Sequence, residues 1–146
     1  MDFTLNEEQQ MFKDTCASLA DDMLAPKAGE WDQGHIYPTD AVATMAEMGL
    51  MGVAIPDSEG GTGADNLTYA ITMEEISRGC ASCGVIMSVN NSLYCDPVHR
   101  FARPEQRAEW LAPYASGEKL GAFALTEPGN GSDAAAMRTT AELEGD

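Results

Sequence analysis

The sequence predicts a mainly α-helical domain over residues 1–120, followed by the first strands of a β domain over residues 121–146. Apolar residues recur at helical spacing through most of the first part, between prolines and glycines that mark helix ends. After Gly121 the pattern changes to a strand-length alternation of small and larger apolar residues. With 146 residues, 44% of them hydrophobic, the chain is long enough and apolar enough to form a folded core.

Acidic residues dominate the charge of the chain. Lys and Arg total 8 against 24 Asp and Glu, which gives a formal net charge of −16. Binding to nucleic acid or to anionic lipid requires basic side chains, so we expect neither kind of partner. No apolar run approaches the ~20 residues of a membrane span, and Met1–Glu8 lacks the basic start and apolar middle of a signal peptide. We therefore expect a cytoplasmic protein without a membrane span.

The first two helices are predicted from their end signals. Thr4 and Glu7 have the spacing of a capping box, which places the start of the first helix there. This helix should end before Pro26, because proline lacks an amide donor and clashes with the preceding turn. The second helix should begin near Pro38 and end at Gly49.

The stretch 57–65, DSEGGTGAD, is a polar and glycine-rich loop. It could cradle an anion or simply connect two helices. The absence of a GK[ST] ending favours the connection. A third helix should begin near Asn66. Its inward face is predicted to hold Leu67, Ala70, Ile71 and Ile76, and its outward face Glu74, Glu75 and Arg78.

The stretch 84–94, GVIMSVNNSLY, is apolar on nearly every side, which predicts a helix buried all round. Its polar residues are Asn90, Asn91 and Ser92, and buried polar groups need partners. They either cap backbone groups or face a ligand, and capping is the more common role. A further helix begins at Pro104 and ends before Gly117, with an inward face formed by Trp110, Leu111 and Tyr114.

The four cysteines are widely spaced, so we expect reduced thiols and not a disulfide framework; they are Cys16, Cys80, Cys83 and Cys95. Cys80 and Cys83 have CxxC spacing, but there is no second such pair, and the two histidines, His35 and His99, stand alone. We therefore expect no metal site. A redox motif would call for a strand leading into a helix, which the sequence does not indicate.

The segment after Gly121 carries the strongest chemical signal. GAFALT has the pattern of a strand, and the EPGNGSD that follows supplies turn formers and two acids; a second strand is expected at 139–143. Glycines permit close approach of the backbone, which suits a planar polar ligand or a phosphate. An ordinary turn is the alternative.

Residues 122–133, AFALTEPGNGSD, resemble the flavin-contacting signature of the acyl-CoA dehydrogenases. The stretches 48–67, 73–94 and 101–129 also resemble this family, in the same order along the chain. The residues 76–94 are most similar to the short-chain, butyryl-type members. The resemblance extends over nearly the whole chain.

The resemblance implies a helical N-terminal domain of the acyl-CoA dehydrogenase type, followed by the beginning of a middle β-barrel domain. It further implies FAD as cofactor, α,β-dehydrogenation of a short-chain acyl-CoA, electron transfer to an electron-transferring flavoprotein, and a homotetramer for the full-length protein. The catalytic base of the family, a Glu, is expected beyond residue 146, so no catalytic residue is assigned here and Glu127 is expected to be structural. The alternative is a truncated, non-catalytic binding or assembly module that lacks the base-bearing domain.

The resemblance also implies site residues. The residues expected to contact FAD are Phe123, Leu125, Thr126, Gly131 and Ser132. The first three would line the flavin ring, with the Thr126 hydroxyl bonded to its pyrimidine edge. Gly131 and Ser132 would lie near the flavin and the CoA arm of the substrate. The expected substrate-binding residues are Ser132, together with Ile86, Met87 and Val89 at the floor of the acyl pocket.

Overall fold

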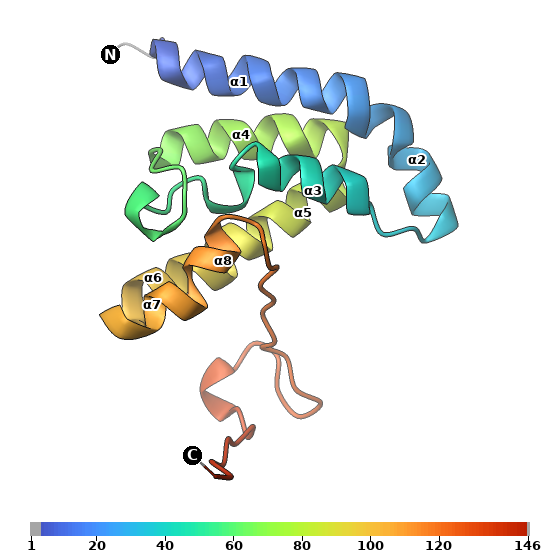
Figure 1. Ribbon diagram of the computed structural model, residues 1–146. Helices are drawn as coiled ribbons and strands as arrows, with labels where there is room; N and C mark the ends of the chain where they lie inside the picture. The colour runs from blue at the N-terminus through green and yellow to red at the C-terminus, as the bar shows by residue number, and fades with distance from the viewer. Residues whose placement is uncertain (1–3, 146) are drawn as a thin grey trace.

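The computed structural model describes residues 4–145, and it is a bundle of helices followed by an extended tail (Figure 1). Residues 1–3 and 146 lie outside the described residues. The ends of the predicted ranges 1–120 and 121–146, and the first part of Met1–Glu8, therefore fall outside them too. The α-helices are α1 (Glu7–Leu19), α2 (Ala25–Gly34), α3 (Thr39–Glu47), α4 (Asn66–Gly79), α5 (Ala81–Ser88), α6 (Asp96–Phe101), α7 (Pro104–Trp110) and α8 (Ala112–Ala115). Two π-helical segments, Ala20–Leu24 and Val89–Cys95, and three 3₁₀ turns, Leu50–Gly52, Asp57–Glu59 and Ala134–Ala136, complete the secondary structure.

Helix α1 begins with a capping box, but two residues later than predicted. Asn6 Oδ1 accepts a hydrogen bond from the Gln9 amide at 2.8 Å, and Gln9 Oε1 accepts one from the Asn6 amide at 3.1 Å. The Gln9 side chain also donates to Asp65 at the start of α4. This contact buries Gln9 between α1 and α4, which lie side by side (Figure 1). The packing of the two helices therefore selects this box over the one predicted at Thr4 and Glu7.

The predicted helix end before Pro26 is wrong. α1 continues through the π-helical segment Ala20–Leu24 directly into α2, with Pro26 in the first turn of α2. The Ala25 amide donates to the Ala20 carbonyl, five residues back, which gives the wider turn of a π-helix. Because the turn before it is wide and its own amide is not needed there, Pro26 fits without a break. α2 ends at His35, whose φ of 52° is left-handed.

The second predicted helix is confirmed as α3, and the chain turns after it at Gly49 with a φ of 73°. The glycine-rich loop that follows folds back on the preceding turn. The amides of Thr62, Gly63 and Ala64 donate to the carbonyls of Gly52, Ile55 and Val53 at 2.8–2.9 Å. These donors already have partners within the protein, as a connecting loop requires and an anion cradle does not.

Helix α4 begins as predicted, with Asp65 as its N-cap, but its buried face differs in part. Ile71 and Ile76 are buried as expected, whereas Leu67 and Ala70 are exposed. Glu75, predicted to face outward, is buried. It accepts a hydrogen bond from Arg78, which also binds Asp21 at 2.6 Å. Because α4 packs on both α1 and α5, its buried stripe is shifted from the predicted one.

Helix α5, the π-helical segment Val89–Cys95 and α6 form one continuous rod. Cys83 and Met87 on this rod belong to the main core with Met45 and Leu50. The prediction of burial all round is wrong for one side, since Val85 is 60% exposed. After the rod, α7 and α8 bury Leu111, but Trp110 remains largely exposed, contrary to prediction. Among residues 4–145, no helix has both the length and the hydropathy of a membrane span.

The strands predicted at 121–126 and 139–143 are not found among the described residues. The only β pairing there is an isolated bridge between Glu127 and Asn130. A strand requires a neighbouring strand to bond with, and in this structure the tail extends away from the helices (Figure 1). The fold shown is therefore mainly helical.

Candidate functional site

Asn90 joins the helical rod to the tail. Its side chain is fully buried, and its Nδ2 donates to the carbonyls of Met51 at 2.7 Å and Tyr114 at 2.9 Å. Its Oδ1 accepts a hydrogen bond from the Gly121 amide at 2.8 Å. The predicted cofactor segment thus begins at a residue held by the predicted acyl-pocket helix.

Gly121 has no room for a side chain. A Cβ at this position would lie 2.1 Å from Tyr94 Cγ, and the Tyr94 ring in turn packs on Tyr114 with 4.3 Å between ring centroids. The close approach of backbone to ring fixes the point at which the tail leaves the helices.

Asn91, the next residue, bonds to the same turn after α3 that Asn90 binds. Its Oδ1 accepts from the Val53 amide at 2.7 Å, and its Nδ2 donates to the carbonyls of Leu50 and Met87 at 2.9 Å. Ser92 donates to the Ser88 carbonyl. The prediction that these polar residues cap backbone groups is therefore confirmed.

The predicted flavin-contacting side chains lie along the exposed tail. Phe123 is 50% and Leu125 37% exposed, and Thr126, Gly131 and Ser132 are also exposed. Within the described residues, no backbone amide of 122–126 donates to another backbone group. Neither Gly129 nor Gly131 has an atom within 4 Å of an added Cβ. This segment thus presents apolar side chains, a hydroxyl and backbone amides to its surroundings.

Glu127 organises the turn that follows. Its carboxylate accepts hydrogen bonds from the amides of Arg138 and Thr139 at 2.8 Å, and from the Thr139 hydroxyl. The Thr139 hydroxyl, followed by the two amides, lowers the pKa of Glu127. The carboxylate therefore acts as an acceptor that holds the loop 127–139 together, in agreement with the structural role expected for it.

Asn130 lies inside this loop with an unusual side chain. Both its Oδ1 and its Nδ2 are shielded from solvent, yet neither has a hydrogen-bond partner in the part of the chain that the structure describes. Buried polar atoms of this kind are costly unless they are bonded. The loop therefore carries an unsatisfied donor and acceptor beside Gly131 and Ser132, which suits a polar ligand.

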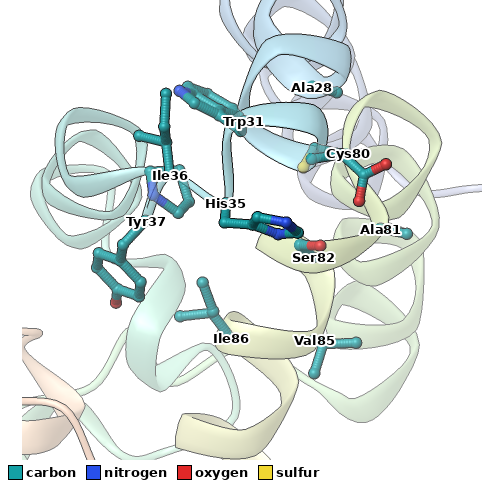
Figure 2. Close-up of a pocket in the computed structure, with 12 residues that line it drawn as sticks. Ala28, Trp31, His35, Ile36, Tyr37, Cys80, Ala81, Ser82, Val85 and Ile86 are labelled. Atoms are coloured by element: carbon teal, nitrogen blue, oxygen red, sulfur yellow. The ribbon is translucent and has the colours of Figure 1, made fainter.

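The three predicted acyl-pocket residues do not share one environment. Met87 is fully buried in the helical core, whereas Ile86 and Val89 are half-buried. Ile86 lies on the wall of a pocket of about 620 Å³ between the C-terminal end of α2, the turn to α3 and α5 (Figure 2). The pocket wall and the core thus lie on different sides of the same helix.

Apolar side chains form much of the pocket wall. Trp31, Ile36 and Tyr37 from the α2–α3 connection face Val85 and Ile86 across it (Figure 2). Sequence reasoning did not single out these first three residues. Their signal in the sequence is the pair of apolar residues Ile36 and Tyr37 directly before Pro38, whose side chains are exposed in the structure.

The CxxC cysteines lie at the same pocket and carry free thiols. Cys80 lines the pocket wall, and Cys83 is fully buried one helical turn further on. Burial, followed by a hydrogen bond to Cys80, raises the pKa of Cys83. Among the described residues, no group of three His, Cys, Asp or Glu side chains could hold a metal ion.

Comparison with known proteins places these features in context. Residues 6–118 match the family model described as acyl-CoA dehydrogenase, N-terminal domain. The human mitochondrial short-chain specific acyl-CoA dehydrogenase is 53% identical over 142 residues, which are 97% of this chain and 34% of the human protein. The chain therefore spans about a third of the length of this relative.

Two solved structures have the same fold. Butyryl-CoA dehydrogenase from Megasphaera elsdenii superposes with a TM-score of 0.88 at 33% identity, over 95% of this chain and 37% of that one. A chain from the structure described as the electron transferring flavoprotein of Acidaminococcus fermentans superposes with a TM-score of 0.94 at 44% identity, over 100% of this chain and 38% of that one.

Proposed function

Because the chain belongs to the acyl-CoA dehydrogenases, we propose that it is the N-terminal part of an FAD-dependent enzyme that removes hydrogen from the α and β carbons of a short-chain acyl-CoA thioester. The observation that carries this proposal is the Asn90 side chain, which binds the start of the cofactor segment to the helix that carries the acyl-pocket residues. One buried residue thus connects the segment that leads into the proposed cofactor residues to the helix of the proposed acyl pocket.

We divide the chain into a helical domain over residues 1–120 and the beginning of a middle β domain over residues 121–146. The division falls where Gly121 contacts Tyr94 and the backbone leaves the helical body. The amides of 122–126, which donate to no backbone group within residues 4–145, are those that neighbouring strands of a β domain would bind.

The residues assigned to FAD are Phe123, Leu125, Thr126, Gly131 and Ser132. The first two offer apolar surface to a planar ring, and Thr126 offers a hydroxyl for its polar edge. The unsatisfied amide of Asn130, next to Gly131, fits a ligand with both donors and acceptors. When bound, FAD would accept the hydride removed from the substrate.

The acyl chain is assigned to the α5 rod, at Ile86 and Val89, with Ser132 near the CoA arm. Met87 supports this floor from the core and does not line it, because its side chain is fully buried. An electron-transferring flavoprotein is the proposed electron acceptor, and a homotetramer the proposed assembly of the whole enzyme. The superposed structure described as the electron transferring flavoprotein of Acidaminococcus fermentans supports the first assignment, and the second rests on the family resemblance.

Titration of the protein with FAD, followed by flavin fluorescence, tests the cofactor site. The Thr126→Val variant should bind FAD roughly tenfold more weakly, since one hydrogen bond to the ring is lost. Thr140→Val, in the same exposed tail, should bind as the wild type does. Equal affinity for the two variants, or no binding by the wild type, would contradict the assignment.

A second measurement addresses the alternative of a non-catalytic binding or assembly module. Butyryl-CoA is added to the FAD-treated protein together with an artificial electron acceptor. Turnover would exclude the module. FAD binding without turnover would retain the cofactor site and assign the base to another part of the enzyme.

A further inference from the structure

The four cysteines differ in their surroundings. Cys16 lies in α1 and Cys95 ends the π-helical segment Val89–Cys95. Cys80 and Cys83 are three residues apart at the start of α5, with Cys80 as its N-cap. Side chains at this spacing lie on the same face of a helix, about 5–6 Å apart at their Cβ atoms.

The backbone at Cys80 allows the two sulfurs to approach further. Cys80 is the N-cap of α5, with φ −155° and ψ 110°, so it is extended and stands just outside the helix. Its carbonyl already accepts the first helical bond, from the Gly84 amide at 3.0 Å. A disulfide requires Cβ atoms about 3.5–4.5 Å apart. Rotation at the extended Cys80 can supply this approach without breaking a hydrogen bond of α5.

The corner that holds the pair is tightly packed. A Cβ on Gly79 would lie 2.8 Å from Ala20 Cβ, and a Cβ on Gly84 would lie 2.2 Å from Ser77 Oγ. The glycines on either side of the CxxC sequence thus let α4, α5 and the π-helical segment Ala20–Leu24 approach closely. This packing constrains the backbone on both sides of the CxxC sequence.

Only Cys80 of the two lines the pocket shown in Figure 2, with 7% of its surface exposed, while Cys83 is fully buried. A small reagent in the pocket therefore reaches Cys80 first. Asp32 also lines this pocket, and the whole chain carries a formal charge of −16. Both charges disfavour an anionic oxidant such as glutathione disulfide and favour a neutral one.

We propose that Cys80 and Cys83 are a peroxide-sensitive thiol pair that a neutral peroxide, entering through the apolar pocket, converts to a disulfide within the first turn of α5. The Cys80 sulfur attacks the peroxide oxygen, the O–O bond breaks, and the products are a sulfenic acid and water. The Cys83 sulfur then attacks the Cys80 sulfur, and the Cys83 proton leaves with the hydroxyl group as a second water. The two thiols lose two electrons, which the O–O bond accepts.

A redox CxxC motif was expected to follow a strand that leads into a helix, and this pair does not. A single extended residue, Cys80, leads into α5 in place of a strand. Burial raises the pKa of Cys83, which favours the protonated form of that thiol. The inference is independent of the proposed enzymatic function, because it requires neither FAD nor substrate.

The test treats the protein with hydrogen peroxide, stops the reaction with acid, and alkylates free thiols in guanidinium. Reduction and a second alkylating reagent then mark the thiols that were oxidised, and tandem mass spectrometry locates them. Cys80 and Cys83 should be marked together, roughly tenfold faster than Cys16 and Cys95 in the same chain, because access and pairing favour them. Equal oxidation of all four thiols would overturn the proposal.

Two variants and an unfolded control extend the test. In Cys83→Ser the second step is blocked, so a sulfenic acid on Cys80 should accumulate and react with dimedone. Cys95→Ala should still form the disulfide. Wild-type protein oxidised in guanidinium should lose its selectivity. A Cys83→Ser variant with a native circular dichroism spectrum but no dimedone adduct would overturn the assignment of Cys80 as the attacking thiol.

Discussion

At the scale of single residues, Asn90 has the largest structural consequence. It bonds to backbone groups that lie 39, 24 and 31 residues away, in the turn after α3, in α8 and at the start of the tail. A buried amide can satisfy this many groups because its oxygen accepts hydrogen bonds while its NH₂ group donates two. Leaving those backbone groups without partners would be costly, since water cannot reach them.

Replacement of Asn90 by Ala should lower the free energy of unfolding by about 3 kcal/mol, because two carbonyls and one amide lose their partner. Urea denaturation followed by circular dichroism measures this change. Asn66→Ala, at the exposed start of α4, is the matched control and should change stability by less than about 0.5 kcal/mol. Similar midpoints for the two variants would contradict the role of Asn90.

At the scale of elements, both π-helical segments precede a proline. Ala20–Leu24 leads to Pro26 and Val89–Cys95 leads to Pro97, and each proline occupies the first turn of the α-helix that follows. The amide at the end of each segment donates five residues back, Ala25 to Ala20 and Asp96 to Asn91. The wider turn gives the proline ring room, so the helix continues where proline would ordinarily end it.

A second contact between elements is electrostatic. Glu59, in the 3₁₀ turn Asp57–Glu59, accepts from His99 of α6 at 2.5 Å and from Arg107 of α7 at 2.9 Å. Burial raises the pKa of Glu59, but the bonds from Arg107 and His99 together outweigh it, so the pKa is lowered. The side chain is only 21% exposed, so solvent weakens these bonds less than at an open surface.

The stability that Glu59 contributes should depend on pH. Its pKa in the folded protein lies below the ordinary value of 4.5, so the contribution is fully present above pH 4.5 and is lost as the pH falls through the folded pKa. Glu59→Gln should lower the free energy of unfolding at pH 7 by about 1 kcal/mol and reduce the loss of stability below pH 4.5.

Urea denaturation at several pH values, with Asp57→Asn on the same turn as control, measures this effect. The control should follow the wild type. An acid dependence of Glu59→Gln as steep as that of the wild type would show that other carboxylates cause it.

At the scale of the whole molecule, the chain consists of a packed helical body and an exposed tail. The core is formed by residues of α1 to α5 and the turn after α3, with a smaller cluster around Leu111 and Cys95. Beyond Gly121 every residue from 122 to 145 is exposed, except Glu127 and Asn130. The tail is held to the helical body at Asn90, and the hydrogen bonds of Glu127 close the loop 127–139 within the tail.

Hydrogen exchange should separate these two parts. Amides of α4 and α5 should exchange slowly, because they are bonded within packed helices, while those of 122–126 should exchange in seconds. The amides of Arg138 and Thr139 should be intermediate, since Glu127 accepts from both. Mass spectrometry of peptic fragments provides the measurement. Strong protection throughout 122–143 would show that the tail pairs with a partner.

Much of the fold and part of the site could be predicted from the sequence. The α3 boundaries, the start of α4 and the turn at Gly117 follow from Pro, Asp and Gly residues whose effects are local. The start of α1 and the passage through Pro26 could not be predicted in the same way. The first depends on the contact of Gln9 with Asp65, which is distant in the sequence, and the second on a π-helical turn that packs against α4.

The sequence by itself determined the family and the helical class, because a signature such as AFALTEPGNGSD and helical periodicity are written in consecutive residues. Only the tertiary structure decided which carbonyls Asn90 and Asn91 satisfy, that Met87 lies in the core, and that Cys80 faces a pocket. It also decided that 121–126 forms no strand in this structure. The physical reason is the same in each case: burial, side-chain hydrogen bonding and strand pairing depend on groups distant in the chain, and these meet only when it folds.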